Sequence, residues 1–250
     1  MLIFTFLGFV VGVLIGLTGV GGGALITPSL IFLGVEPLTA VGTDLMYASV
    51  TKIFGTFFHK KNGNVRLDTS LKLFLGSFPA IVIGSQILRT IDRELINHYL
   101  TILLGVILVI TSIMSLRKNK FKKNENLKFL TLIMIGFIVG LIVQFTSVGA
   151  GVLVSFILAN FTTLNPRHVV GTTIFYGLLL SLFSTVSHVS LGNVNYSLAL
   201  WLIFGTIPGV YTGTYLNSNI KKDKLRRIIN LLILFIGVLI IIYVLGSIKI

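Results

Sequence analysis

A glycine-rich break interrupts the apolar start of the chain at Thr18-Gly19-Val20-Gly21-Gly22-Gly23-Ala24. A second break, Thr146-Ser147-Val148-Gly149-Ala150-Gly151, interrupts an apolar run in the second half. Each break precedes an apolar piece of about ten residues, whereas a membrane-spanning helix needs ~20. Backbone without helical hydrogen bonds is tolerated at membrane depth only where protein or a water-filled cavity shelters it. The breaks therefore predict two half-helices inside a membrane protein.

The composition places the whole chain in a bilayer. Of its 250 residues, 54% are apolar and only 11% are charged, and the mean hydropathy is +1.00. A soluble domain of this size has about a quarter of its residues charged, so an ordinary globular enzyme is excluded. The net charge of +13 comes from clusters of Lys and Arg between apolar runs, which is typical of loops at a membrane surface and not of nucleic-acid binding. Without cysteine there is no disulfide and no thiolate site, and we expect no metal and no cofactor.

The apolar runs predict an all-α polytopic fold of ten helical segments. They are Leu2–Leu17, Ala24–Leu33, Pro37–Phe58, Thr69–Leu88, Leu95–Leu116, Leu127–Phe145, Val152–Phe161, Pro166–Ser187, Ser197–Leu216 and Leu225–Leu245.

The basic residues decide between two topologies, because cytoplasmic loops are enriched in Lys and Arg. If each half-helix completes one crossing with the helix before it, the basic loops are divided equally between the two faces. If each half-helix turns back or crosses separately, fifteen Lys and Arg residues share one face and only Arg89, Arg93 and Lys249 lie on the other. We therefore predict a plasma-membrane protein with the basic face in the cytoplasm and both termini outside. An odd number of crossings in each half also inverts the halves relative to each other.

The two halves are an internal repeat. An offset of 128 aligns the two breaks, and an offset of 129 aligns the following segments, including Pro37 with Pro166 and His59 with His188. The matches fall on Gly, Pro, His, Asn and Thr, so shared apolar composition does not explain them. We assign residues 1–116 to the first repeat, 117–127 to a basic cytoplasmic linker and 128–250 to the second repeat. Inverted repeats with broken helices are typical of secondary transporters, in which the substrate binds at the repeat interface.

The same motifs resemble a known family. They are Gly19 to Leu25 with Pro28, Ala40-Val41-Gly42-Thr43, His59 with Gly63-Asn64-Val65, and Leu75-Gly76-Ser77 with Pro79 and Gly84-Ser85. Together they resemble the TauE/SafE sulfite exporter family of bacterial and archaeal membrane permeases, over nearly the whole chain in two copies. The resemblance implies transport of a small sulfur-containing anion such as sulfite, a sulfonate or thiosulfate.

The breaks are the candidate substrate site. A break leaves the first N–H groups of the next half-helix unpaired, and the helix dipole adds partial positive charge there, which suits an oxyanion. The alternative is that these glycines only allow helices to pack closely. The candidate substrate-binding residues are Thr18, Gly21, Gly22, Gly23, Thr43, Thr146, Gly149, Ala150, Gly151 and Thr172.

Two charged residues interrupt the run from Pro37 to Phe58 and are candidates for coupling or gating. Asp44 is the acidic residue deep in an apolar run, and an intramembrane carboxylate is a functional candidate by default. We expect it to carry a proton with the anion, the alternative being a neutral group hydrogen-bonded to a neighbouring helix. Lys52, two turns further on, either attracts the anion or extends toward the basic face, and the sequence favours the second.

His59 and His188 are paired by the repeat and are also gating candidates. In an inverted arrangement they lie at opposite faces, so the sequence favours a separate role for each at a helix end over a shared site.

A carrier for a small sulfur-containing anion is the leading interpretation, possibly coupled to protons. An anion channel, or a permease for another small organic anion, is the alternative. An enzyme is not expected, since no catalytic motif is present, and a scaffold has no need of two broken helices. The expected partners are the anion, the lipid bilayer and possibly a second copy of the chain.

Overall fold

The computed structural model describes residues 1–18, 22–116, 127–216 and 222–247. Within these ranges the chain is helical and contains no strand, which confirms the all-α prediction. The helices are α1 (Leu2–Thr18), α2 (Gly23–Phe32), α3 (Pro37–Lys61), α4 (Leu67–Thr90), α5 (Arg93–Leu116), α6 (Phe129–Thr146), α7 (Ala150–Phe161), α8 (Pro166–Ser190), α9 (Tyr196–Leu216) and α10 (Lys222–Ser247).

Five of these helices are long and apolar enough to cross a membrane, among the residues that the structure describes: α4, α5, α6, α8 and the segment Arg227–Gly246 of α10. The chain is thus a multi-pass membrane protein by length and composition. The two expected half-helices are present as α2, with 10 residues, and α7, with 12 residues. Ile26 and Leu30 of α2 are fully buried, so this short helix is enclosed by the others.

The helices α3 and α8 extend past the apolar runs that predict them, to Lys61 and Ser190. Helix formation needs backbone hydrogen bonds and not apolar side chains, so the polar residues after each run continue the helix until a turn stops it. Gly63 and Gly192 supply the turns, with φ of 67° and 71°, a left-handed conformation that glycine adopts without strain. The amides of Asn64 and Asn193 then bond the carbonyls of His59 and His188, both at 2.9 Å.

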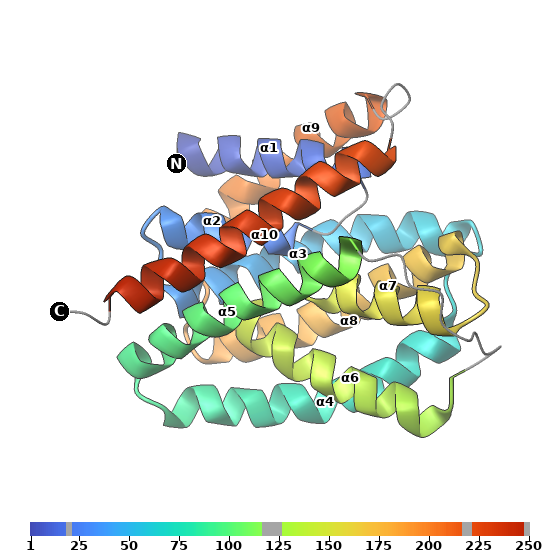
Figure 1. Cartoon of the computed structure of the whole chain (residues 1–250), viewed down its shortest axis with the longest axis horizontal. Helices are drawn as coiled ribbons and strands as arrows, with labels where there is room; N and C mark the ends of the chain where they lie inside the picture. Colours follow the sequence, from blue (N-terminus) through green and yellow to red (C-terminus); the bar gives the residue numbers. More distant parts are fainter. Residues whose placement is uncertain (19–21, 117–126, 217–221, 248–250) are drawn as a thin grey trace.

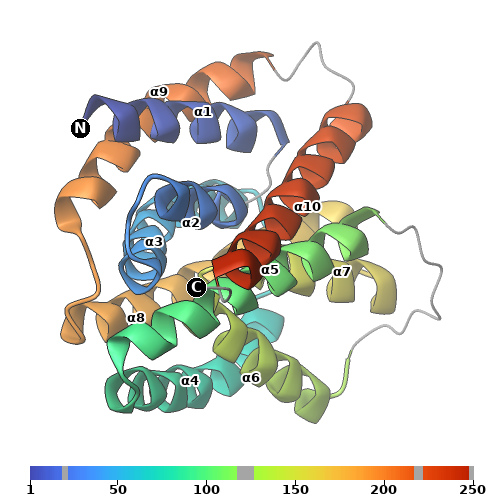
Figure 2. The same cartoon turned by 60° about the vertical axis from the view of Figure 1, so that its left-hand side comes forward.

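In two closely packed helix pairs, one helix comes from the first half of the chain and the other from the second half. The pair α1 and α9 lies along one side, and the pair α4 and α6 lies along another (Figure 2). The helices α5 and α10 cross each other, and α3 packs against α8. Each of these contacts joins residues before and after the linker, so the two halves are interlocked along their length.

Glycines make the two close pairs possible. A Cβ added to Gly205 of α9 would lie 1.9 Å from the carbonyl oxygen of Thr5, and one added to Gly8 of α1 would lie 2.2 Å from that of Leu202. The equivalent residues of the other pair, Gly76 and Gly136, would meet the carbonyl oxygens of Ile133 and Leu73 at 2.0 and 1.9 Å. Residues related by the repeat thus make equivalent contacts, as expected of two similar halves. The orientation of those halves in a membrane stays a prediction.

The chain ends and the connections separate into two groups (Figure 1). The start of α1, the end of α10 and the α2–α3, α4–α5 and α8–α9 connections lie at one end of the molecule, at the left of the figure. The α3–α4 and α7–α8 connections lie at the other end, together with the end of α5 and the start of α6. The start of α1 and the end of α10 thus lie on one side, and the end of α3, with Lys60 and Lys61, and the start of α8, with Arg167, lie on the other.

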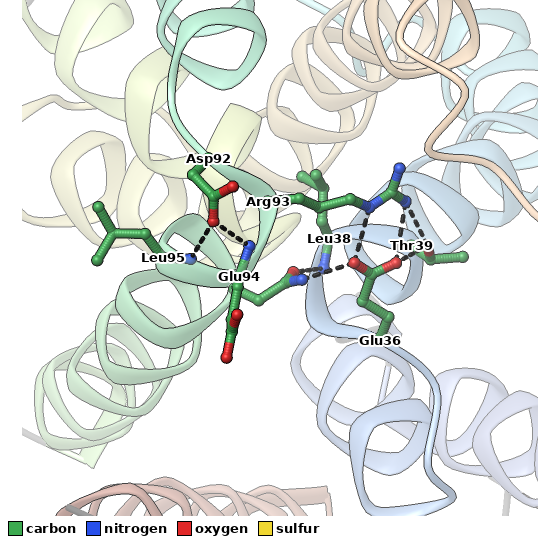
Figure 3. A network of polar contacts seen from close by, with 8 residues as sticks. Glu36, Leu38, Thr39, Asp92, Arg93, Glu94 and Leu95 are labelled. Carbon is green, nitrogen blue, oxygen red and sulfur yellow. Dashed lines mark hydrogen bonds and ion pairs between the residues drawn. The ribbon is translucent and has the colours of Figure 1, made fainter.

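A polar network joins the α2–α3 connection to the start of α5 (Figure 3). The guanidinium of Arg93 donates to both carboxylate oxygens of Glu36, with Nε to Oε1 at 2.7 Å and Nη2 to Oε2 at 2.9 Å. Asn97 donates its amide N–H to Glu36 Oε1 at 2.6 Å, and its Oδ1 accepts from the backbone N–H of Leu38. The guanidinium holds the pKa of Glu36 at about 2, below its ordinary value of 4.5. We call this group the Glu36 latch.

Candidate functional site

The two breaks meet inside the protein, although they are far apart in the sequence. Gly23, the first residue of α2, faces Ser147 in the break between α6 and α7. A Cβ added to Gly23 would lie 3.1 Å from the Ser147 carbonyl oxygen and 3.3 Å from Asp44 Oδ2. Ser147 has a φ of 61° and ends α6 in a left-handed conformation. The glycine therefore leaves the space into which the second break enters.

Asp44 of α3 lies at this junction and is fully buried. Its Oδ2 accepts a hydrogen bond from Thr27 Oγ1 of α2 at 2.6 Å and a second one from Ser147 Oγ. Its Oδ1 is buried and has no hydrogen-bond partner among the described residues. A single carboxyl group thus connects α2, α3 and the second break, and one of its oxygens is left available.

The second half contains the equivalent contact without the carboxyl group. Ser155 of α7 donates to Thr173 of α8 at 3.2 Å, and the repeat pairs Ser155 with Thr27 and Thr173 with Asp44. The two hydroxyls keep the half-helix attached to the long helix. Only the first half therefore places an ionisable group at the junction.

Thr43 and Thr172 do not lie at the breaks. Thr43 Oγ1 accepts from the backbone N–H of Asn195 at 3.0 Å, and Thr172 Oγ1 accepts from that of Arg66 at 3.1 Å. Both side chains are fully buried, and each fixes the connection that follows the other half's long helix. The hydroxyl groups of these two substrate-binding candidates are thus bonded to connections, although Thr43 directly precedes Asp44 in the chain.

Among the other candidates at the breaks, Thr146 bonds to its own helix, since its Oγ1 donates to the Ile142 carbonyl at 2.7 Å. Gly149 has a φ of 118°, and Ala150 begins α7 as a buried residue. Gly151 has nothing within 4 Å of an added Cβ. The side chain of Thr18 and the whole of Gly21 lie outside the described residues.

The start of α2 provides the first unpaired amides of a helix beside this junction. Gly22 precedes α2, and an added Cβ there would lie 2.9 Å from Ile15 and 3.4 Å from Tyr47. A helix of ten residues has a dipole, and its first N–H groups have no partner within the helix. The start of α7 lies just beyond Ser147 in the chain, so both half-helices begin close to Asp44.

Two tyrosines missed by the sequence reasoning brace the long helices. Tyr47 shares a hydrogen bond with Thr206 at 2.9 Å, and Tyr176 shares one with Ser77 at 2.7 Å. Thr206 in turn donates to the carbonyl of Gly8 at 3.0 Å. The repeat aligns Tyr47 with Tyr176. This alignment of two tyrosines was the signal in the sequence that could have identified them.

Lys52 does not extend to the basic end of α3, as the sequence favoured. Its Nζ donates to the carbonyl oxygen of Gly177 at 3.3 Å, and Gly177 lies near the middle of α8 (Pro166–Ser190). The ammonium group therefore stays at the depth of the helix centres.

The two histidines do not share a site. His188 Nε2 donates to the carbonyl oxygen of Gln144 at 3.0 Å, and its buried Nδ1 has no partner among the described residues. His59 is in the last turn of α3, and its Nδ1 is also unpaired there. Both residues occupy helix ends, as predicted, and their gating roles stay predictions. No cluster of His, Cys, Asp or Glu able to hold a metal occurs in the part of the chain that was described.

The sequence comparisons agree with this architecture. The family model for the sulfite exporter TauE/SafE matches residues 4–240. The chain belongs to the TauE/SafE sulfite exporter family.

Relatives extend across bacteria and archaea. The probable membrane transporter protein YjnA of Bacillus subtilis is 35% identical over 92% of this chain and 96% of its own length. YdhB of the same organism, also named a probable membrane transporter protein, is 27% identical over 88% of this chain and 92% of its own. The probable membrane transporter protein MJ0441 of Methanocaldococcus jannaschii is 26% identical over 88% and 87%. No solved structure matches the chain. This member of the TauE/SafE family is accordingly a multi-pass membrane transporter.

Proposed function

We propose that this protein is a secondary carrier for a small sulfur-containing anion, such as sulfite, a sulfonate or thiosulfate, that binds where the two breaks meet. The contact between Gly23 and Ser147 carries the proposal, because it brings the breaks of both halves together on Asp44. Substrate sites of inverted-repeat transporters lie at the interface of the repeats. The family supports the class of anion, since its description names sulfite export.

The chemistry of the junction suits an oxyanion. The amides at the starts of α2 and α7 offer hydrogen bonds together with partial positive charge, and glycine at position 23 lets the anion approach the backbone. A negatively charged Asp44 would repel the anion at this distance, so Asp44 binds a proton when the anion is present. One proton and one anion then move together, and the driving force comes from the pH gradient.

The grouping of the helix ends and connections supports the proposed membrane topology (Figure 1). The end that contains the α3–α4 and α7–α8 connections faces the cytoplasm, because basic residues accumulate on that side of a plasma membrane. Both termini then lie outside. Gly23 and Ser147 are reached from opposite sides through the two inverted halves.

Thermal unfolding of the purified full-length protein with sulfite, thiosulfate, sulfate, taurine and sulfoacetate tests the class of substrate. At least one sulfur-containing anion raises the unfolding temperature. Gly23→Leu reduces this shift because its side chain fills the junction, whereas Gly246→Leu, in open space at the end of α10, retains it in full. A folded, monodisperse Gly23→Leu protein with wild-type affinity contradicts the site.

Transport in liposomes separates the carrier from the channel. A carrier exchanges internal and external anion in a saturable manner, so unlabelled anion inside accelerates the entry of labelled anion. Uptake that rises linearly with concentration and shows no such exchange favours the channel.

A further inference from the structure

Lys52 is a half-buried cation at the interface of α3 and α8. Its ammonium group contacts the carbonyl oxygen of Gly177, near the middle of α8. A Cβ on Gly177 would lie 3.4 Å from both Cε and Nζ of Lys52, so the glycine makes room for the long side chain. The exposed apolar residues of α3, Ile53, Phe54 and Phe57, lie on the other side of this helix. Lys52 therefore faces α8 and not the lipid.

The ammonium group of Lys52 forms no ion pair with a carboxylate of the described residues. The ion pairs between described residues are Lys72 with Asp68 and Arg93 with Glu36, and none of them involves Lys52. Asp44 lies two turns away on the same helix and bonds Thr27 and Ser147 instead. A charge at membrane depth is expensive, and such residues usually pair with another charge or lie on an ion pathway. A transported anion, which binds and then dissociates, supplies the missing negative charge beside Lys52.

Polar side chains continue from Lys52 toward the basic end of α3. Thr56 and His59 follow at spacings of four and three residues, which place them along one face of the helix. Thr56 is 7% exposed, and its Oγ1 has no hydrogen-bond partner among the described residues; the same is true of His59 Nδ1. In the opposite direction, Ser49 shares a hydrogen bond with Thr185 of α8. The unpaired groups thus lie between Lys52 and the end of the helix.

We propose that Lys52 forms a second binding station for the transported anion, between the junction at Asp44 and the basic end of α3. Its ammonium group binds the oxygens of a sulfite, thiosulfate or sulfonate group, and Thr56 donates its free hydroxyl to the same anion. This inference rests on the proposed anion transport. It adds a site on the α3–α8 interface that is separate from the breaks.

The test uses the purified full-length protein, titrated separately with sulfite, thiosulfate, sulfate, taurine and sulfoacetate. Lys52→Met removes the charge and keeps the length of the side chain. It weakens the Kd of the anion bound at the α3–α8 interface about 10-fold to 100-fold, which is the effect of losing one hydrogen bond to a charged group. Lys52→Arg restores the Kd to within a few-fold, and Lys60→Met, which removes a charge from the exposed end of the same helix, leaves it unchanged.

The stability of the ligand-free protein distinguishes the station from a structural tether. The ammonium group makes one hydrogen bond, to a carbonyl oxygen within α8, and no ion pair with a described residue. We therefore expect the Tm of Lys52→Met to equal or exceed that of the wild type. A lower Tm or a failure to fold, or a Kd within twofold of the wild type, overturns the station. Gly23→Leu distinguishes the two proposals. If Lys52→Met loses binding while Gly23→Leu keeps wild-type affinity, the site at the breaks is wrong and the station at Lys52 is retained. A wild-type protein that binds none of the five anions overturns both.

Discussion

The chemistry of Asp44 is decided by how its two oxygens differ. Oδ2 accepts two hydroxyl hydrogen bonds, whereas Oδ1 is buried and unpaired. The alternative expected from the sequence, an aspartate hydrogen-bonded to a neighbouring helix, is therefore present in the geometry, and it does not conflict with proton transfer. One oxygen holds α2 and the second break, and the other remains free to bind a proton.

Asp44→Asn separates these two roles. The amide oxygen still accepts from Thr27 and Ser147, so the variant binds the anion with wild-type affinity. It cannot release a proton, and uptake driven by a pH gradient in liposomes falls to the level measured without a gradient. Asp44→Ala leaves two buried hydroxyls without their acceptor and lowers the stability by about 1–3 kcal/mol. Full gradient-driven uptake by the Asn variant removes Asp44 from coupling.

The close helix pairs depend on glycine at the element scale. Gly205→Ala places a methyl group 1.9 Å from the Thr5 carbonyl oxygen, so α1 and α9 must separate. Overpacking of this kind costs about 1–3 kcal/mol, and we expect a lower Tm in detergent. Gly246→Ala in α10 has open space and serves as the control. Equal Tm values for the two variants contradict backbone contact between α1 and α9.

The Glu36 latch predicts a dependence on pH. Its pKa is lowered from 4.5 to about 2, so the latch contributes its full stability above pH 4.5 and loses it as the pH falls toward 2. The Tm of Glu36→Gln is therefore lower than that of the wild type at pH 7, and the difference shrinks below pH 4.5. Glu94→Gln, at an exposed neighbouring position, shows no such difference. If the Tm difference between the wild type and Glu36→Gln is constant from pH 7 to pH 3, the ion pair is not its cause.

The latch also marks an asymmetry between the halves. The repeat places Asn165 opposite Glu36, and Asn165 caps α8 by accepting from the His168 amide at 2.8 Å. A cap fixes one helix end, whereas the latch joins two elements. If the carrier opens at the end of the molecule that holds the latch, this opening has to break the Arg93–Glu36 ion pair.

Topology is the prediction at the scale of the whole molecule. The chain contains no cysteine, so single cysteines report unambiguously. Asn62→Cys and Ser190→Cys are exposed and follow or end the two long helices α3 and α8. A membrane-impermeant thiol reagent labels position 190 in intact cells and labels position 62 only after lysis. Labelling of both positions from the same side contradicts inverted halves.

The sequence predicted the helices because apolar length and glycine breaks are local signals. The sequence predicted the ends of α3 and α8 several residues before the ends in the structure, because polar residues after an apolar run do not stop a helix. The junction was predicted only in part. The breaks were predicted to form the substrate site, but the contact of Asp44 with Ser147 joins the two halves of the chain and has no local signal in the sequence. The position of Lys52 was missed for the same reason, because it depends on a glycine in another helix.

The pairing of α1 with α9 and of α4 with α6 has a consequence for how the protein is made. Both first-half helices leave the ribosome well before their partners, with glycine faces that expose backbone carbonyls to lipid. Neither half buries these faces alone, so each is an incomplete assembly intermediate until the other is inserted. We expect residues 1–120 and 121–250 to be degraded when produced singly and to accumulate as a complex when co-expressed. Stable accumulation of either fragment by itself contradicts this order of assembly. We therefore expect the first half to stay in the membrane without its partner helices until the second half is inserted.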